Sequence, residues 1–311
     1  MGAYLFVHFS GTESSENSEQ IYFSVSEDGK KWRTLNGKKT VLVSGIGERG
    51  VRDPFIIKSP SGGKYYIIAT DLSIYHRRND GNAWIDCQTK GSRNIIVWES
   101  DDLIEWSDAR AVEAAVENAG CAWAPEAMYD PERDMYIVYW ASTVSDDGFK
   151  YQRVYSAYTK DFKEFTPAEL YINNASDDEI ANGAAASNID TTITEYGGVY
   201  YRFTKNESNS SVIMDKSVSL SGKWEPVGTY NLGKMRGFEG PTIFKLHNES
   251  KWCLLLDHFT ERTGYEPFIT EDISKGVFEK SEECEFDDIY RHGSVMPITD
   301  EEYERLKNRF E

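Results

Sequence analysis

Three acidic residues stand at the starts of short strand-like runs that lie far apart in the sequence: Asp53, Asp190 and Glu239. Ala124 and His292 occupy the corresponding places at the starts of two further runs. Three carboxylates brought to one place repel one another, so such a cluster is costly unless it binds a cation or moves protons. The alternative is that each acid only begins a turn before its strand, as Asp often does before Pro. The matched positions favour acid–base chemistry or cation binding.

The strands that would position these acids belong to a pattern that occurs five times. Polar turns that end in a large aromatic residue place Trp32, Trp106, Phe165, Trp224 and Phe278 at intervals of 74, 59, 59 and 54 residues. Each unit also contains runs of β-branched and aromatic residues joined by turns rich in Gly, Asp and Asn. A repeat of about 55–60 residues with several strands per unit is typical of a β-propeller. A β-sandwich, the alternative, gives no reason for one order of signals to recur five times.

The fifth unit is divided between the two ends of the chain. Its first strand-like run is 293–298, and the runs that follow it are 4–9 and 20–25. A circular array closes in this way, with one blade built from both ends. The sequence therefore predicts an all-β fold, a five-bladed β-propeller whose ring is closed by N- and C-terminal strands in one blade. Residues 1–311 are expected to form a single propeller domain with a short C-terminal helix at about 300–309.

Aromatic side chains near the starts of the innermost strands are candidates to stack against a ligand ring. Trp123 and Phe238 stand beside two of the strand starts. Trp84 lies in the stretch 75–93, which lengthens the first interval. We interpret this stretch as a loop insertion that forms one wall of a pocket.

The composition excludes several classes of partner. A net charge of −18 disfavours nucleic acid and anionic membranes, which would repel the protein. No window approaches the roughly 18 apolar residues of a membrane span, and the four cysteines match no metal-binding spacing. The first residues enter an alternating strand pattern without a basic region, so a cytoplasmic location is expected. The alternative is a secreted or periplasmic protein whose leader is removed.

Five motifs, one in each unit and in a fixed order, carry a resemblance to a known family. They are residues 52–56 (RDPFI), 123–126 (WAPE), 189–193 (IDTTI), 239–242 (EGPT) and 291–294 (RHGS). With these motifs the sequence resembles glycoside hydrolase family 43, the five-bladed propeller α-L-arabinofuranosidases and β-xylosidases. Each motif alone is weak. In phase with the repeat, the five together extend the resemblance over essentially the whole chain.

The resemblance implies an inverting mechanism with three carboxyl groups in distinct roles. Asp53 would be the general base that activates water, and Glu239 the general acid that protonates the leaving sugar. Asp190 would orient the acid and tune its pKa. Inversion needs the base and the acid about 6.5–9.5 Å apart, so that a water molecule fits between them. The first and fourth units of a five-membered ring are not adjacent, which suits such a gap.

The resemblance also extends to a histidine and two arginines. His292 resembles the axial histidine of the family, which contacts a central calcium ion or a water network; a buried, hydrogen-bonded histidine is the alternative. The implied chemistry requires no cofactor, and a structural calcium ion is the one candidate metal. Arg291 and Arg52 are candidates to hydrogen-bond substrate hydroxyls or the acid, and each could equally be a structural salt-bridge partner. Glu126 is interpreted as a pocket or structural residue.

The expected activity is the release of terminal α-L-arabinofuranosyl residues from plant-type polysaccharides or oligosaccharides. Runs 4–9 and 50–55 look most like the arabinofuranosidase branch of the family. Exo-β-1,4-xylosidase activity, alone or combined with arabinofuranosidase activity, is the first alternative, because the two pentoses present similar hydroxyl geometry. A non-catalytic sugar-binding propeller is the second, although a lectin has no need of an acid and a base. The expected partner is an arabinose- or xylose-containing oligosaccharide or polysaccharide.

Overall fold

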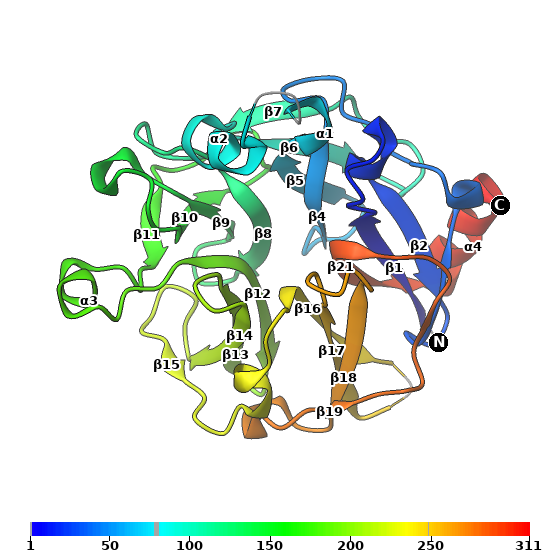
Figure 1. The fold of residues 1–311 in the computed structure, drawn as a ribbon. Coiled ribbons are helices and arrows are strands. Elements are labelled where there is room, and N and C mark those ends of the chain that lie inside the picture. Colours follow the sequence, from blue (N-terminus) through cyan, green and yellow to red (C-terminus); the bar gives the residue numbers. More distant parts are fainter. Residues whose placement is uncertain (1, 78–80, 248) are drawn as a thin grey trace.

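Five small β-sheets surround one central axis in the computed structural model, which describes residues 2–77, 81–247 and 249–311 (Figure 1). The innermost strands contact one another around the axis in chain order, and the last contacts the first. The predicted all-β, five-bladed β-propeller is therefore confirmed.

Blades I to IV are four-stranded antiparallel sheets in which the first strand is innermost. Blade I contains β4 (Val51–Lys58), β5 (Tyr65–Asp71), β6 (Asn94–Ser100) and β7 (Arg110–Glu113). Blade II contains β8 (Trp123–Asp130), β9 (Met135–Ser142), β10 (Arg153–Thr159) and β11 (Glu169–Ile172). Blade III contains β12 (Asn188–Tyr196), β13 (Val199–Asn206), β14 (Ser211–Ser217) and β15 (Glu225–Pro226). Blade IV contains β16 (Glu239–Leu246), β17 (Lys251–Asp257), β18 (Tyr265–Thr270) and β19 (Glu279–Lys280).

Blade V joins the two ends of the chain, as predicted (Figure 1). Its innermost strand, β21 (Arg291–Thr299), pairs with β1 (Gly2–Phe9), and β2 (Tyr22–Ser26) and β3 (Lys31–Thr34) follow outward. A further strand, β20 (Glu285–Phe286), pairs in parallel with β3 at the outer edge. Strands from the C-terminal part of the chain thus flank the N-terminal strands on both sides and close the ring.

Hydrophobic side chains fill the interfaces between neighbouring blades, because alternate residues of each strand face opposite sides of its sheet. Between blades I and II, for example, Tyr66, Tyr136 and Phe162 contact one another. The polar turns that mark the repeat follow the third strand of each blade. In blade I the side chains of Ser100 and Asp102 accept backbone N–H groups of the turn, which explains why Ser and Asp recur there.

The stretch 75–93 is largely helical, which corrects its interpretation as a loop. It contributes most of α1 (Ile74–Arg77) and all of α2 (Ala83–Lys90); residues 78–80 lie outside the described part of the chain. Fully buried Glu19 accepts the backbone N–H groups at the start of α1, and Asn82 caps α2. Hydrogen bonds to Glu19 and to Asn82 therefore support two short helices at this position.

The remaining helices are short. α4 (Asp300–Phe310), at the predicted position, buries Tyr303 and Leu306 against blades V and I. The others are α3 (Asp177–Asn182) and the 3₁₀ turns η1 (Glu16–Glu19), η2 (Asn36–Lys38), η3 (Ser145–Asp147), η4 (Asn231–Lys234) and η5 (Ile273–Lys275). In the part of the chain that the structure describes, none of the helices has the length and apolar character to cross a membrane.

Candidate active site at the mouth of the propeller

Each innermost strand carries a β-bulge near its first residues. On β4 the register with β5 shifts just after Arg52, and β8, β12, β16 and β21 shift at the matching places. Four bulge residues have left-handed backbone conformations, with φ of 51° at Asp53, 48° at Ala124, 48° at Asp190 and 51° at Gly240. Such a conformation is strained for any residue but glycine. Bulges often re-aim side chains, and here each of the five inner strands has one near its start.

The bulges correct the alignment of the five strand starts. In blade IV the residue equivalent to Asp53 and Asp190 is Gly240, and Glu239 stands one place earlier, equivalent to Arg52. The residues that precede the bulge all line one cavity: Arg52, Trp123, Ile189, Glu239 and Arg291. Two successive positions of each inner strand, rather than one, therefore build the site.

Blade IV has glycine in its bulge because His292 of blade V fills the adjoining space. A Cβ atom on Gly240 would lie 2.7 Å from Cγ of His292. Tyr265 holds the two strands in this arrangement: its hydroxyl donates to the carbonyl of Gly240 over 2.8 Å and accepts the N–H of Gly293 over 2.9 Å. The acid of blade IV consequently projects from the preceding residue, Glu239.

A cavity of about 640 Å³ opens among these residues. We call it the mouth cavity. Eight of the nine predicted site residues line it: Arg52, Asp53, Trp84, Trp123, Asp190, Glu239, Arg291 and His292. Phe238 is the exception. The structure thus brings together side chains from all five blades and from the helical insertion.

Asp53 is held ionised on the blade I side of the mouth cavity. The Thr70 hydroxyl donates to Oδ2 of Asp53 over 2.8 Å, and Nδ1 of His292 lies 3.3 Å from Oδ1. Burial opposes ionisation, but the hydrogen bond and charge of His292 and the charge of Arg52 bring the pKa of Asp53 below its ordinary value. An ionised carboxylate near neutral pH is what a general base requires.

Asp190 lies between His292 and the strand that carries Glu239. Its Oδ2 accepts the N–H of Gly240 over 3.1 Å, and its Oδ1 is 3.7 Å from Nδ1 of His292. Burial raises the pKa of Asp190 to about 7, with the positive charges of His292 and Lys205 opposing the rise. Asp190 can therefore hold a proton near neutral pH.

His292 carries a positive charge between two carboxyl groups. Burial opposes that charge, but Asp190 and Asp53 raise the pKa of His292 to about 10. An imidazolium has no lone pair to offer a metal and repels a cation. No group of three or more His, Cys, Asp or Glu side chains could hold a metal ion within residues 2–77, 81–247 and 249–311. The positive charge that faces the two carboxyl groups is that of His292.

Two cations hold Glu239. Nη2 of Arg291 donates to Oε1 over 3.0 Å, and Nζ of Lys205 donates to Oε2 over 2.7 Å. Burial would raise the pKa of Glu239, but the charges of Lys205 and Arg291 hold it below its ordinary value. Fully buried Asp257 accepts a hydrogen bond from Nε of Arg291 over 2.6 Å. This bond orients the guanidinium toward Glu239. Arg291 is placed to bind the acid, one of its two predicted roles.

Arg52 is committed to contacts within the protein. Its Nη1 donates to Glu19 over 2.9 Å and to Glu13 over 3.2 Å. The guanidinium lies 4.6 Å from the ring centre of Phe9 and 5.1 Å from that of Trp84. These contacts favour the salt-bridge alternative for Arg52 over hydrogen bonding to a substrate. Arg52 instead fixes the insertion that carries Trp84 against the N-terminal segment.

Two of the three predicted stacking residues form one wall of the mouth cavity. The rings of Trp84 and Trp123 meet edge to face, with their centres 6.2 Å apart, and Trp84 is 40% exposed. Phe238 lies elsewhere: its ring stacks on His258 with the centres 4.3 Å apart, inside the hydrophobic core between blades III and IV. The prediction that Phe238 stacks on a sugar is corrected, because both strand packing and His258 enclose its ring.

Comparison with protein-family models identifies the family of this chain. The model for the glycosyl hydrolase 43-related family, described as a probable glycosyl hydrolase domain, matches residues 1–304. The chain belongs to the glycosyl hydrolase 43-related family. The resemblance to family 43 that the five motifs carry is thereby confirmed.

A curated relative of this family 43 chain carries the name of an arabinofuranosidase. An α-L-arabinofuranosidase of Bifidobacterium longum subsp. longum is 28% identical to this chain, in a match that covers 80% of this chain and 26% of that protein. The chain thus spans about a quarter of the length of this relative.

Solved structures share the fold at low sequence identity. The catalytic domain of a family 62 α-L-arabinofuranosidase from Coprinopsis cinerea has a TM-score of 0.54 and 12% identity over 80% of this chain and 76% of that one. A family 43 protein from Bacillus licheniformis has a TM-score of 0.55 and 14% identity over 96% and 55%. An exo-β-1,3-galactanase from Clostridium thermocellum has a TM-score of 0.56 and 13% identity over 77% and 51%.

Three polar residues of this family 43 site were missed from the sequence. Thr70, Lys205 and Asp257 lie near the ends of the second strands of blades I, III and IV, where each pairs with the residue that precedes the bulge. Each then bonds a charged group of the mouth cavity. The signal that could have found them is the repeat itself, applied to the last polar residues of the second strands.

Glu126 is a further buried carboxyl group and does not line the mouth cavity. The Tyr139 hydroxyl lies 3.5 Å from its Oε2. Burial raises the pKa of Glu126 to about 8, with the positive charge of His292 opposing the rise. This geometry agrees with a structural role for Glu126.

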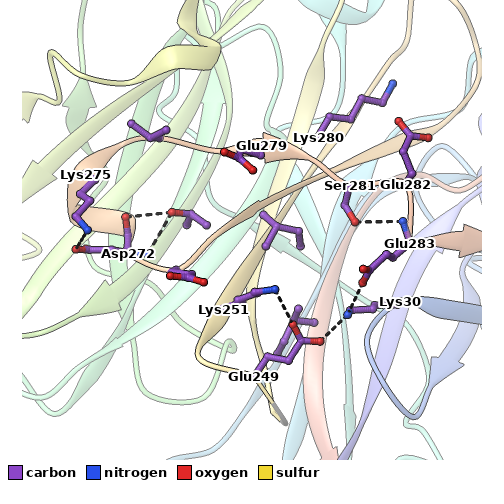
Figure 2. Close-up of a pocket in the computed structure, with 15 residues that line it drawn as sticks. Lys30, Glu249, Lys251, Asp272, Lys275, Glu279, Lys280, Ser281, Glu282 and Glu283 are labelled. Carbon is purple, nitrogen blue, oxygen red and sulfur yellow. Dashed lines mark hydrogen bonds and ion pairs between the residues drawn. The ribbon is translucent and has the colours of Figure 1, made fainter.

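A second cavity, of about 660 Å³, lies beside the outer strands of blades IV and V; we call it the outer groove (Figure 2). Lys30 bonds both Glu249, over 2.5 Å, and Glu283, over 2.6 Å. Lys251 lies 3.3 Å from the other oxygen of Glu249. The lining that the structure describes includes no aromatic side chain. Its lysines are paired with carboxylates, and the described lining offers no buried acid comparable to those of the mouth cavity.

Proposed function

We propose that this protein is an inverting glycoside hydrolase that releases terminal α-L-arabinofuranosyl residues from plant-type oligosaccharides or polysaccharides. One observation carries the proposal: ionised Asp53 and cation-held Glu239, from blades I and IV, open into one cavity with Asp190, which accepts the N–H of Gly240 beside Glu239. Membership of family 43 supports glycoside hydrolysis, and the name of the Bifidobacterium relative supports arabinofuranose as the sugar.

Asp53 acts as the general base in this mechanism. It removes a proton from a water molecule, whose oxygen then attacks the anomeric carbon as the glycosidic bond breaks. Thr70 and His292 each engage one oxygen of Asp53, so the carboxylate is held in one orientation before the substrate arrives. Such positioning lowers the entropy that must be lost in the transition state.

Glu239 acts as the general acid from the blade IV side. It donates a proton to the leaving oxygen, while Arg291 fixes the direction of its carboxyl group. Asp190 bonds the N–H of Gly240, next to Glu239, so the charge of Asp190 acts directly on the acid. Because both reacting groups are carboxyls, the reaction requires no cofactor, and dialysis against EDTA should leave kcat/KM unchanged.

The shape of the mouth cavity favours action at chain ends. A volume of about 640 Å³ suits a small sugar unit rather than a long stretch of polymer. Trp84 and Trp123 form one wall, and Glu13 and Arg262 line the cavity from the segments after β1 and β17. A pocket closed by these segments would admit a terminal residue and leave the rest of an arabinose-containing chain outside.

The test is hydrolysis of aryl glycosides, chiefly α-L-arabinofuranoside, β-D-xyloside and β-D-galactoside, with the configuration of the first product followed by proton NMR. We expect arabinofuranoside turnover and release of β-L-arabinofuranose. Faster turnover of the xyloside would overturn the proposed sugar and favour the xylosidase alternative. Release of the α-anomer would overturn inversion. Binding of a pentoside without turnover would overturn hydrolysis and favour a sugar-binding propeller.

A further inference from the structure

Lys205 is a buried lysine that contacts two acids of the mouth cavity at once. It is 2% exposed, and its Nζ lies 2.7 Å from Oε2 of Glu239 and 2.6 Å from Oε2 of Glu207. The ammonium also lies 4.3 Å from the ring centre of Phe259. Glu207 follows β13, and its side chain is 39% exposed at the cavity rim. Lys205 thus has a second partner already in place if it leaves Glu239.

The charges around Glu239 oppose its function as an acid. The charged groups that face it are Asp190 on β12, Lys205 on β13, Asp257 on β17, Arg262 in the segment after β17, and Arg291 and His292 on β21. Lys205 and Arg291 touch the carboxylate directly and favour its ionised form. A general acid must carry a proton before it can donate one. Release of one of these two cations would therefore favour the protonated form of Glu239.

Only one of the two cations is free to do so. Nε of Arg291 is bonded to fully buried Asp257 over 2.6 Å, which fixes the guanidinium in place. Lys205 has a compact charge on a flexible stem and can turn toward Glu207 without losing its charge partner. The movement required is short, since Nζ already bonds both carboxylates.

We propose that Lys205 is a positioning residue that passes from Glu239 to Glu207 when a sugar enters, and that this exchange lets Glu239 take up the proton it donates. The inference rests on the proposed function, in which Glu239 is the general acid. The proton comes from solvent through the open mouth and passes to the leaving oxygen. Glu239 then returns to its ionised form and binds Lys205 again.

The exchange predicts opposite effects for two neighbouring substitutions. Lys205→Met removes a positive charge from Glu239 and should raise its pKa. Glu207→Gln removes the competing acid, commits Lys205 to Glu239 and should lower that pKa. Lys205→Arg keeps the charge and should resemble the unsubstituted protein. A lysine whose charge did not act on Glu239 would leave the pKa of Glu239 unmoved in both variants.

The kinetic test is the pH dependence of kcat/KM on an alkyl α-L-arabinofuranoside, whose leaving oxygen needs protonation. The alkaline limb reports loss of the acid's proton. We expect it to move up by about 1 pH unit in Lys205→Met and down by less in Glu207→Gln. Lys30→Met is the matched control, because Lys30 also bonds two glutamates but lies in the outer groove. Unmoved limbs, or limbs that move in one direction in both variants, would overturn the proposal.

A second readout does not depend on activity. Carbon-13 NMR of protein labelled at the glutamate carboxyl carbons, with Glu239→Gln to assign the signal, follows the titration of Glu239 directly. A higher pKa in Lys205→Met and a lower one in Glu207→Gln support the exchange, and an unchanged titration refutes it. Failure to cleave any glycoside would refute the proposed function instead. If Lys205→Met does not fold, Glu207→Gln still provides the test, because the Glu207 side chain is exposed. A lowered pKa of Glu239 in that variant supports the exchange, and an unchanged pKa refutes it.

Discussion

Two lysines in this protein have the same local chemistry and opposite surroundings. Lys30 in the outer groove bonds Glu249 and Glu283, and Lys205 in the mouth cavity bonds Glu239 and Glu207. The distances fall between 2.5 and 2.7 Å in both cases. The Lys30 side chain is 18% exposed, whereas that of Lys205 is 3% exposed. The two cavities also have nearly equal volumes, about 660 and 640 Å³.

The difference lies in what surrounds the ion pairs. In the outer groove, hydrogen bonds to Lys30 and Lys251 lower the pKa of Glu249, which keeps it charged over the neutral range. In the mouth cavity, burial brings the pKa of Asp190 to about 7 and that of Asp257 to about 6. The two cavities have similar volumes, so volume does not explain the difference. Burial of the carboxyl groups where the inner strands meet brings their pKa values close to neutral pH.

The largest expected effect comes from removing the base of the mouth cavity. Asp53→Asn keeps the shape of the side chain but cannot accept a proton from water. We expect kcat on an aryl α-L-arabinofuranoside to fall by about 10³-fold, within the range typical of general bases. Steady-state kinetics at pH 6 to 8 measures the loss. Retention of more than about a tenth of the activity would show that Asp53 is not the base.

Loss of the acid should depend on the leaving group, which distinguishes it from loss of the base. Glu239→Gln cannot protonate the leaving oxygen, so substrates with alkoxide-like leaving groups should lose about 10²–10³-fold in kcat. Aryl glycosides with acidic phenols need little protonation and should lose about tenfold or less. A plot of log kcat against leaving-group pKa measures the difference. Equal losses across the series would contradict the assignment of Glu239.

The fold could be predicted because the sequence repeats the same pattern five times. Turn signals recur in the same order in each unit, and the split fifth unit indicates how the ring closes. The helices of the insertion could not be predicted in the same way. The first of them, α1, depends on hydrogen bonds to Glu19, a residue more than 50 positions away in sequence, and no local periodicity encodes such a contact.

The site could be predicted for the inner strands and the insertion, but not for the second strands. Asp53 and Asp190 were aligned correctly, but the alignment placed Glu239 in their row because it could not foresee that His292 leaves room only for glycine at 240. Lys205 was missed because its role depends on strand pairing across a hairpin. Phe238 was misplaced because adjacency in sequence does not tell which side of a strand a ring faces.

The pH dependence of stability should separate a buried carboxyl from an exposed one. Burial raises the pKa of Glu126 from 4.5 to about 8, so its contribution to stability is complete below pH 4.5 and is lost as pH rises through 8. Gln at 126 cannot ionise. Glu126→Gln should therefore lose less free energy of unfolding between pH 5 and pH 9 than the unsubstituted protein, as measured by denaturant titration.

The matched control is Glu282→Gln, at an exposed position that lines the outer groove. Its stability should follow that of the unsubstituted protein over the same pH range. Identical pH profiles for Glu126→Gln and Glu282→Gln would show that burial of Glu126 does not shift its ionisation.

The aromatic wall of the mouth cavity should affect binding more than chemistry. Trp84→Ala removes a half-exposed ring, and loss of one ring contact is worth about 1 kcal/mol, so KM should rise by about fivefold to tenfold. The value of kcat should change less, because Trp84 touches none of the proposed acid–base groups. Ile85→Ala, at a neighbouring position that is 59% exposed and does not line the cavity, is the control. Equal KM values for the two variants would exclude Trp84 from the sugar site.

The smallest effect is expected at the other lysine of the comparison. Lys30→Met breaks the ion pairs with Glu249 and Glu283, and pairs near the surface contribute about 1 kcal/mol or less, since solvent screens them. Unfolding in urea should show a loss of that size, and kcat/KM should stay within about twofold. Because the local geometry matches that of Lys205, any larger change in activity would mean that burial is not what separates the two cavities, and that the outer groove communicates with the site.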